Sequence, residues 1–224
     1  MTPTTMPTPP ASQRDFYDSE YHFKEDVERP HESRIRYILR RLGPLEGKTY
    51  FDLGCGAGWA SRLARYEGRA KRVIGLDFSR TALELAKRHT PEILWIQADG
   101  TALPVADSSV DALHCDGALE HFPDPNKGLA EVARILKPEG KAVILVPNFY
   151  VVTEQPLELR LSYWGWKKRI EAAGLRIDRT GVDWGPPVFG TKNPLRSLKR
   201  LAGRMLGIIP FMQYQFVFVL KRAR

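Results

Sequence analysis

The sequence predicts an α/β fold with a parallel sheet covered by helices, and three observations support this fold class. Strand-like runs that are almost continuously apolar alternate with helix-like runs, as expected for strands buried on both faces. The first strand ends in a glycine-rich turn at residues 54–58, and acidic residues stand at the ends of the first three strands: Asp52, Asp77 and Asp99. Because ligands of open α/β sheets bind at the carboxyl ends of the strands, we expect the functional site there.

The segment before the first strand divides into three parts. Residues 1–13 are rich in Pro and Thr without a charged side chain, which predicts a disordered tail, and residues 14–224 are expected to form a single domain. Residues 14–23 are aromatic and acidic, so they are either a strap docked on the core or a lid over cofactor and substrate. Residues 30–42 have helical apolar spacing, and the arginines of this helix are expected to form a solvated face.

The remaining elements follow in order. Five strands are expected at residues 48–53, 72–77, 93–98, 110–115 and 141–147. One helix follows Ser79, and another has Asp124 as its N-cap, Pro125 in its first turn and Gly140 at its exit. A helix at residues 163–173, a strand near 175–179 and a last strand at 215–220 complete the domain.

The glycine-rich turn indicates a nucleotide-like ligand. It reads G-x-G-x-G, which differs from the G-x-G-x-x-G turn that holds a dinucleotide pyrophosphate. Asp77 follows Gly54 by 23 residues, close to the spacing at which a carboxylate reaches ribose hydroxyls. This pattern alone fits both NAD and S-adenosylmethionine. Phe78 and Asp99 add an aromatic ring and a second carboxylate, which suit an adenosine.

Six segments in this order resemble the class I S-adenosylmethionine-dependent methyltransferases, and most closely the group that includes the ubiquinone and menaquinone biosynthesis methyltransferases. They are residues 52–58, 75–77, 98–100, 109–113, 119–124 and 136–141, within a resemblance that covers roughly residues 30–185. The resemblance implies a Rossmann-like class I methyltransferase fold. Its sheet would have seven mostly parallel strands, helices on both faces and an antiparallel last strand.

The resemblance also implies S-adenosylmethionine as cofactor and a role for each matched residue. The glycine turn would pass under the methionine part, Asp77 would bind the ribose hydroxyls, Phe78 would pack on adenine, and Asp99 and the Gly100 N–H would bind the adenine ring. The cofactor-binding residues assigned on this basis are Asp52, Gly54, Gly56, Gly58, Asp77, Phe78, Asp99, Gly100 and Cys115.

Catalysis is expected to rest mainly on positioning, because the sulfonium carries an already activated methyl group. A base helps if the acceptor is a hydroxyl, and His121 and Asp116, past or at the end of the fourth strand, are the catalytic candidates. In the alternative interpretation, Glu120 and His121 only cap and orient the loop. No metal is expected, since His114, Cys115, Asp116 and His121 match no established ligand spacing.

The acceptor is expected to be a small or lipid-linked molecule, methylated at oxygen. Enzymes that methylate exocyclic amines of nucleic-acid bases carry Asp/Asn-Pro-Pro-aromatic after the fourth strand, where this chain has residues 116–119 as Asp-Gly-Ala-Leu, so nucleic acid is an unlikely partner. The alternatives are an RNA methyltransferase, suggested only by charge, and a cofactor-binding module without turnover.

Charge and composition give the remaining expectations. The 224-residue chain has a net charge of +8 and a pI near 9.6, which favours anionic partners. Two cysteines without disulfide spacing, and no apolar run of about 20 residues, predict a cytoplasmic enzyme. Residues 190–210 read as an inserted basic amphipathic helix. It either covers the substrate side or contacts an anionic membrane at its inner face through residues 192–209.

Overall fold

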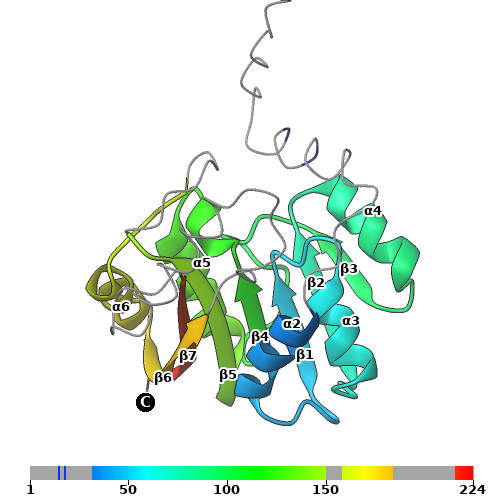
Figure 1. Ribbon diagram of the computed structural model, residues 1–224, viewed down its shortest axis with the longest axis horizontal. Helices are drawn as coiled ribbons and strands as arrows, with labels where there is room; N and C mark the ends of the chain where they lie inside the picture. Colours follow the sequence, from blue (N-terminus) through cyan, green and yellow to red (C-terminus); the bar gives the residue numbers. More distant parts are fainter. Residues whose placement is uncertain (1–14, 16–17, 19–31, 150–157, 184–214, 224) are drawn as a thin grey trace, which may run out of the picture.

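The computed structural model describes residues 15, 18, 32–149, 158–183 and 215–223 (Figure 1). Its α-helices are α2 (Glu32–Leu39), α3 (Trp59–Tyr66), α4 (Arg80–His89), α5 (Pro125–Ile135) and α6 (Tyr163–Ala172). Two 3-10 helices are η1 (Arg40–Leu42) and η2 (Leu119–His121). The strands are β1 (Thr49–Leu53), β2 (Arg72–Asp77), β3 (Leu94–Gln97), β4 (Val110–Asp116), β5 (Leu136–Pro147), β6 (Leu175–Asp183) and β7 (Gln215–Arg222).

The seven strands form one sheet in the order β3-β2-β1-β4-β5-β7-β6. Strands β1 to β5 pair in parallel with one another, whereas β7 pairs antiparallel with both β5 and β6. The structure thus confirms the predicted fold class, including the antiparallel last strand. The chain order reverses between β1 and β4, and this switch point is where an open α/β sheet binds its ligand.

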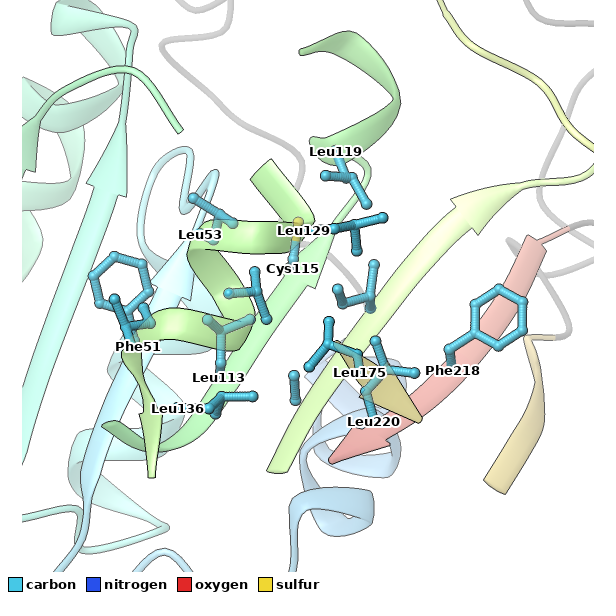
Figure 2. Close-up of a cluster of buried hydrophobic side chains, with 14 of the residues drawn as sticks. Phe51, Leu53, Leu113, Cys115, Leu119, Leu129, Leu136, Leu175, Phe218 and Leu220 are labelled. Atoms are coloured by element: carbon cyan, nitrogen blue, oxygen red, sulfur yellow. The ribbon is translucent and has the colours of Figure 1, made fainter. Parts of the chain in front are cut away.

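Side-chain alternation along the strands divides the core into two layers. In β4, Leu113 and Cys115 face the layer that contains α5 and α6, and Ala112 faces the layer that contains α2 and α3. Figure 2 shows the first layer, with Leu129 of α5 near Cys115. Both faces of the central strands are therefore buried, which explains their nearly continuous apolar sequence.

The junction between α5 and β5 differs from the expectation. Asp124 caps α5 as predicted, since its Oδ1 accepts a hydrogen bond from the N–H of Asn126 over 3.0 Å. The helix ends at Ile135, however, and Gly140 lies inside β5, so the predicted helix exit at Gly140 is wrong. The pairing of β5 with β4 is irregular there, and a Cβ atom on Gly140 would lie 3.0 Å from the carbonyl oxygen of Val110. Glycine therefore avoids a tight contact at this irregular strand pairing, where the backbones approach closely.

Several predicted segments lie outside the described residues. These are the tail at residues 1–13 and the basic helix at residues 190–210. Of the aromatic segment at residues 14–23, the structure describes Asp15 and Asp18, and Oδ1 of Asp18 accepts a hydrogen bond from the N–H of Thr81 over 3.3 Å, at the start of α4. Among the described residues, no helix is long and apolar enough to cross a membrane.

Candidate active site

A cavity of about 200 Å³ opens at the carboxyl ends of β1, β2 and β4. Both catalytic candidates, Asp116 and His121, line it. The cofactor-binding candidates that line it are Gly54, Asp77, Phe78, Asp99 and Gly100. The structure therefore brings together seven of the eleven predicted site residues, from five separate segments of the chain, around one cavity.

The turn after β1 places bare backbone at the cavity. Gly54, Gly56 and Gly58 have φ angles of 71°, 50° and 82°, a left-handed region that side chains with a Cβ atom disfavour. The N–H of Gly54 donates to the carbonyl of Leu76 over 2.8 Å, which ties the turn to β2. A Cβ atom on Gly54 would lie 2.2 Å from Cβ of Ala118. The turn and the loop after β4 thus approach closely only because residue 54 is glycine.

Asp77 fixes the same turn from the end of β2. Its Oδ2 accepts a hydrogen bond from the N–H of Gly56 over 2.8 Å, and its Oδ1 accepts one from the N–H of Ser79 over 2.9 Å. Burial raises the pKa of this carboxyl above its usual value. The backbone of Phe78 also hydrogen-bonds to this carboxyl group, and a carboxylate has about four acceptor sites, so Asp77 keeps an acceptor site for a further donor.

Asp99 and Gly100 follow β3 and line the same cavity. Asp99 is exposed, and its Oδ1 accepts hydrogen bonds from the N–H and the hydroxyl of Thr101 over 2.8 and 2.9 Å. A Cβ atom on Gly100 would lie 2.1 Å from Cζ of Phe122. The Phe122 ring, which lines the cavity, therefore packs directly against the Gly100 backbone. Sequence reasoning missed this aromatic contact.

Asp52 is buried below the cavity and does not line it. Its Oδ2 accepts a hydrogen bond from the hydroxyl of Ser61 over 2.7 Å, and its Oδ1 lies 3.0 Å from Nδ1 of His114. Burial lowers the pKa of His114, but the hydrogen bond and charge of Asp52 outweigh this effect and raise it. This arrangement joins β1, α3 and β4, so the direct cofactor contact of Asp52 stays a prediction.

Three other assigned residues also stand back from the cavity: Gly56, Gly58 and Cys115. A Cβ atom on Gly58 would lie 2.5 Å from the ring of Trp95, so this glycine makes room for a tryptophan from β3. The Cys115 thiol is fully buried in the apolar core, and burial raises its pKa well above the usual value (Figure 2). Cofactor contact at these positions remains a prediction. Because the Cys115 side chain is buried in the core, such a contact would have to come from the Cys115 backbone.

Asp116 is held by an arginine that sequence reasoning assigned to solvent. Nη1 of Arg34 donates to Oδ2 of Asp116 over 2.6 Å, and Nη2 donates to Oδ2 of Asp183 over 2.7 Å. Burial alone would lower the pKa of the Arg34 guanidinium, but the two carboxylates raise it. The expected solvated face is therefore wrong for Arg34. A signal existed, because Arg34 precedes buried Ile38 by one helical turn.

Glu120 and His121 are both buried in η2. His121 lines the cavity and donates its backbone N–H to the carbonyl of Ala118 over 3.0 Å. Oε2 of Glu120 has no hydrogen-bond partner among the described residues. Burial raises the pKa of Glu120 to about 8, helped by the charges of Asp116 and Glu158. A carboxyl in this condition is a better candidate for proton transfer than the sequence indicated.

Metal binding gains no support from the described part of the chain. No group of three or more His, Cys, Asp or Glu side chains in this part is arranged to hold a metal ion. The cysteines described, Cys55 and Cys115, are free, and burial raises the pKa of both thiols.

A family model described as a methyltransferase domain matches residues 51–144, which contain the glycine turn, Asp77, Asp99 and η2. Residues 51–144 therefore belong to a methyltransferase domain. The matched segment of this methyltransferase domain runs from β1 into β5 and so includes every residue assigned to the site.

Several curated relatives carry quinone-related names. The methyltransferase domain is 38% identical over 109 residues to a demethylmenaquinone methyltransferase of Renibacterium salmoninarum, covering 49% of this chain and 45% of that protein. It is 39% identical over 104 residues to a 2-phytyl-1,4-naphtoquinone methyltransferase of Thermosynechococcus vestitus, covering 45% and 46%. The chain therefore spans less than half the length of these two relatives.

Solved structures extend the likeness over nearly the whole chain. A chain from the complex between the Haloferax volcanii Trm112 methyltransferase activator and a methyltransferase gives a TM-score of 0.77 at 25% identity, covering 95% of this chain and 100% of that one. An S-adenosylmethionine-dependent methyltransferase from Mesorhizobium loti gives 0.66 at 20% identity, covering 84% and 96%. The comparisons support S-adenosylmethionine as the cofactor. They do not support the RNA methyltransferase and non-catalytic alternatives.

Proposed function

We propose that this chain transfers the methyl group of S-adenosylmethionine to a hydroxyl oxygen of a quinone-type acceptor, either a small molecule or one linked to a lipid chain. The observation that carries the proposal is the cavity at the switch point of the sheet. It is lined by two carboxylates suited to adenosine, Asp77 and Asp99, and by the two candidate catalytic side chains, Asp116 and His121. The quinone-related names of the curated relatives support the acceptor class.

The residues around the cavity fit the cofactor. Asp77 keeps an acceptor site for a ribose hydroxyl, Thr101 donates to Oδ1 and not to Oδ2 of Asp99, and the glycine turn offers bare backbone. Phe78 and Phe122 supply apolar surface at the same cavity. When bound, the cofactor supplies a methyl group on a positively charged sulfur. The protein then has to hold an acceptor oxygen in line with it and exclude water.

Two side chains at the cavity are available for the acceptor. Asp116 is fixed by Arg34 at the end of β4, and His121 stands on η2. We infer that Asp116 orients the acceptor, because both of its oxygens already accept hydrogen bonds from Arg34, over 2.6 and 3.2 Å. His121 is close enough to the cavity to contact the same acceptor. Peripheral contact with an anionic membrane through residues 192–209 remains a prediction from sequence.

The test uses cofactor labelled in its methyl group and a panel of acceptors. The panel contains hydroquinones and catechols with and without prenyl chains, an unrelated phenol, and structured RNA. We expect label to enter a quinol as a methoxy group, which mass spectrometry and NMR distinguish from a ring methyl group. Asp99→Ala is the control with impaired cofactor binding. Label on a ring carbon would overturn oxygen transfer, and turnover of RNA alone would overturn the acceptor class.

A further inference from the structure

The carboxyl group of Glu120 is buried next to a residue that lines the cavity. Glu120 is 2% exposed, and its Oε2 has no hydrogen-bond partner among the described residues. Gly117 lines the cavity, and a Cβ atom built on it would lie 3.9 Å from Oε1 of Glu120. Glu120 itself does not line the cavity, and its neighbour Gly117, which does, contributes only backbone there.

The charges around Glu120 differ sharply from those around Asp116. Asp116 has the guanidinium of Arg34 as an ion-pair partner at 2.6 Å. Glu120 instead faces the negative charges of Asp116 and Glu158, and the Cys115 thiol on β4 is neutral. Its pKa is raised to about 8, mainly by burial. Two carboxyl groups at one site whose surroundings differ this much, one beside a cation and one buried without one, are typical of acid–base pairs.

We propose that Glu120 accepts the proton of the acceptor hydroxyl, and that the sulfonium of the cofactor brings Glu120 into its ionised form. This inference rests on the proposed function. None of the described residues places a cation beside Glu120. A positive charge in the cavity would therefore be the main charge that favours the carboxylate form of Glu120. Binding of the charged cofactor would then release a proton from the protein.

The transfer balances in atoms and charge. The acceptor oxygen forms a bond to the methyl carbon, the bond between sulfur and that carbon breaks, and its electron pair stays on sulfur. The hydroxyl proton moves to the carboxylate of Glu120. One positive and one negative charge are present before the step, and a neutral thioether and a neutral carboxylic acid remain after it. In a buried site this avoids leaving an uncompensated charge.

The experiment is titration calorimetry in two buffers with different ionisation enthalpies, which yields the number of protons released on binding. S-adenosylmethionine is compared with S-adenosylhomocysteine, which has a neutral sulfur. At pH 7 we expect the charged ligand to release close to one proton more than the neutral one, and at pH 9.5 the difference should vanish because Glu120 is already ionised. Glu120→Gln should abolish the difference, and the exposed control Glu139→Gln should retain it.

A second measurement needs only the wild-type protein. The ratio of the affinities for the charged and neutral ligands should rise about twenty- to thirtyfold between pH 6.5 and 9, because below a pKa of about 8 each pH unit changes the ionised fraction of Glu120 about tenfold. A flat ratio, or equal proton release by wild type and Glu120→Gln, would overturn the inference while leaving cofactor binding intact. Failure of both ligands to bind would instead overturn the proposed function and this inference with it.

Discussion

Nη1 of Arg34 donates to Oδ2 of Asp116 across 2.6 Å and so ties α2 to the carboxyl end of β4. The same guanidinium donates to Asp183 at the end of β6 and to Oε1 of Gln215 at the start of β7. Arg34 thus connects its own helix, α2, with three strands of the sheet: β4, β6 and β7. Since Asp116 lines the cavity, this network determines where a candidate catalytic carboxylate stands.

Arg34→Met should destabilise the protein. The substitution keeps the apolar stem but removes the guanidinium that pairs with the half-buried Asp116 and the buried Asp183. We expect the free energy of unfolding to fall by about 2 to 4 kcal/mol, somewhat below the range for a fully buried pair. Urea unfolding followed by tryptophan fluorescence measures it. Arg36→Met, on the same helix but in exposed ion pairs, is the control and should lower the stability much less. Equal losses of stability in the two variants would show that the network around Asp116 stabilises the protein no more than exposed ion pairs do.

Asp77→Ala and Asp99→Ala should both weaken cofactor binding but should differ in their effect on stability. Each should weaken binding of S-adenosylmethionine and S-adenosylhomocysteine by roughly 1 to 3 kcal/mol, because a ligand hydroxyl or amino group loses its acceptor. Only Asp77→Ala should also lower the stability of the unliganded protein, since it removes the acceptor of the Gly56 and Ser79 N–H groups. Calorimetry and urea unfolding measure the two effects. NAD should not bind, and unchanged affinity in both variants would remove the pocket assignment.

The layered fold could be predicted because its signal is local. Apolar runs of strand length mark strands buried on both faces, and Asp124 followed by Pro125 marks the start of α5. The junction at Gly140 could not be predicted this way. Gly140 lies where the pairing of β5 with β4 is irregular. The group that approaches it is the carbonyl oxygen of Val110, which is distant in sequence. Glycine in a sequence indicates a special backbone position, but not which neighbour imposes it.

The candidate site was predictable to the extent that its residues lie at strand ends. Asp77, Asp99 and His121 share a cavity because parallel strands end at one edge of the sheet. Burial, in contrast, depends on tertiary packing. The sequence therefore did not reveal that Arg34 points inward to Asp116, or that Glu120 is the buried carboxyl group with an unpaired oxygen among the described residues.

Gly100→Ala should displace the Phe122 ring. The added methyl group would lie 2.1 Å from Cζ of Phe122, far closer than any real contact, so the ring must move and reshape the cavity. We expect cofactor affinity to fall at least several-fold. Phe122→Leu should weaken binding less, and the double variant should recover part of the loss, because the smaller side chain makes room for the methyl group. A double-mutant cycle by calorimetry measures this coupling. Strictly additive effects would mean that the ring contact does not control the cavity.

Glu120→Gln should make the protein more stable than wild type at pH 8 and not at pH 5. The pKa of Glu120 is raised from 4.5 to about 8 in the folded protein. Between these values the folded protein binds a proton that the unfolded chain has lost, so the wild-type free energy of unfolding falls as pH rises. The fall over this window is at most about 4 to 5 kcal/mol, at about 1.4 kcal/mol for each pH unit.

Glutamine cannot lose that proton, so the difference between variant and wild type should grow steadily from pH 5 to pH 8. Urea unfolding at pH 5, 6.5 and 8 measures it, with Glu139→Gln as the exposed control that should follow wild type at every pH. If Glu120→Gln also follows wild type, the Glu120 carboxyl group is ionised at neutral pH in the unliganded protein. The charged cofactor would then have no proton to displace from it, and the proton-release experiment should give the same value for wild type and variant.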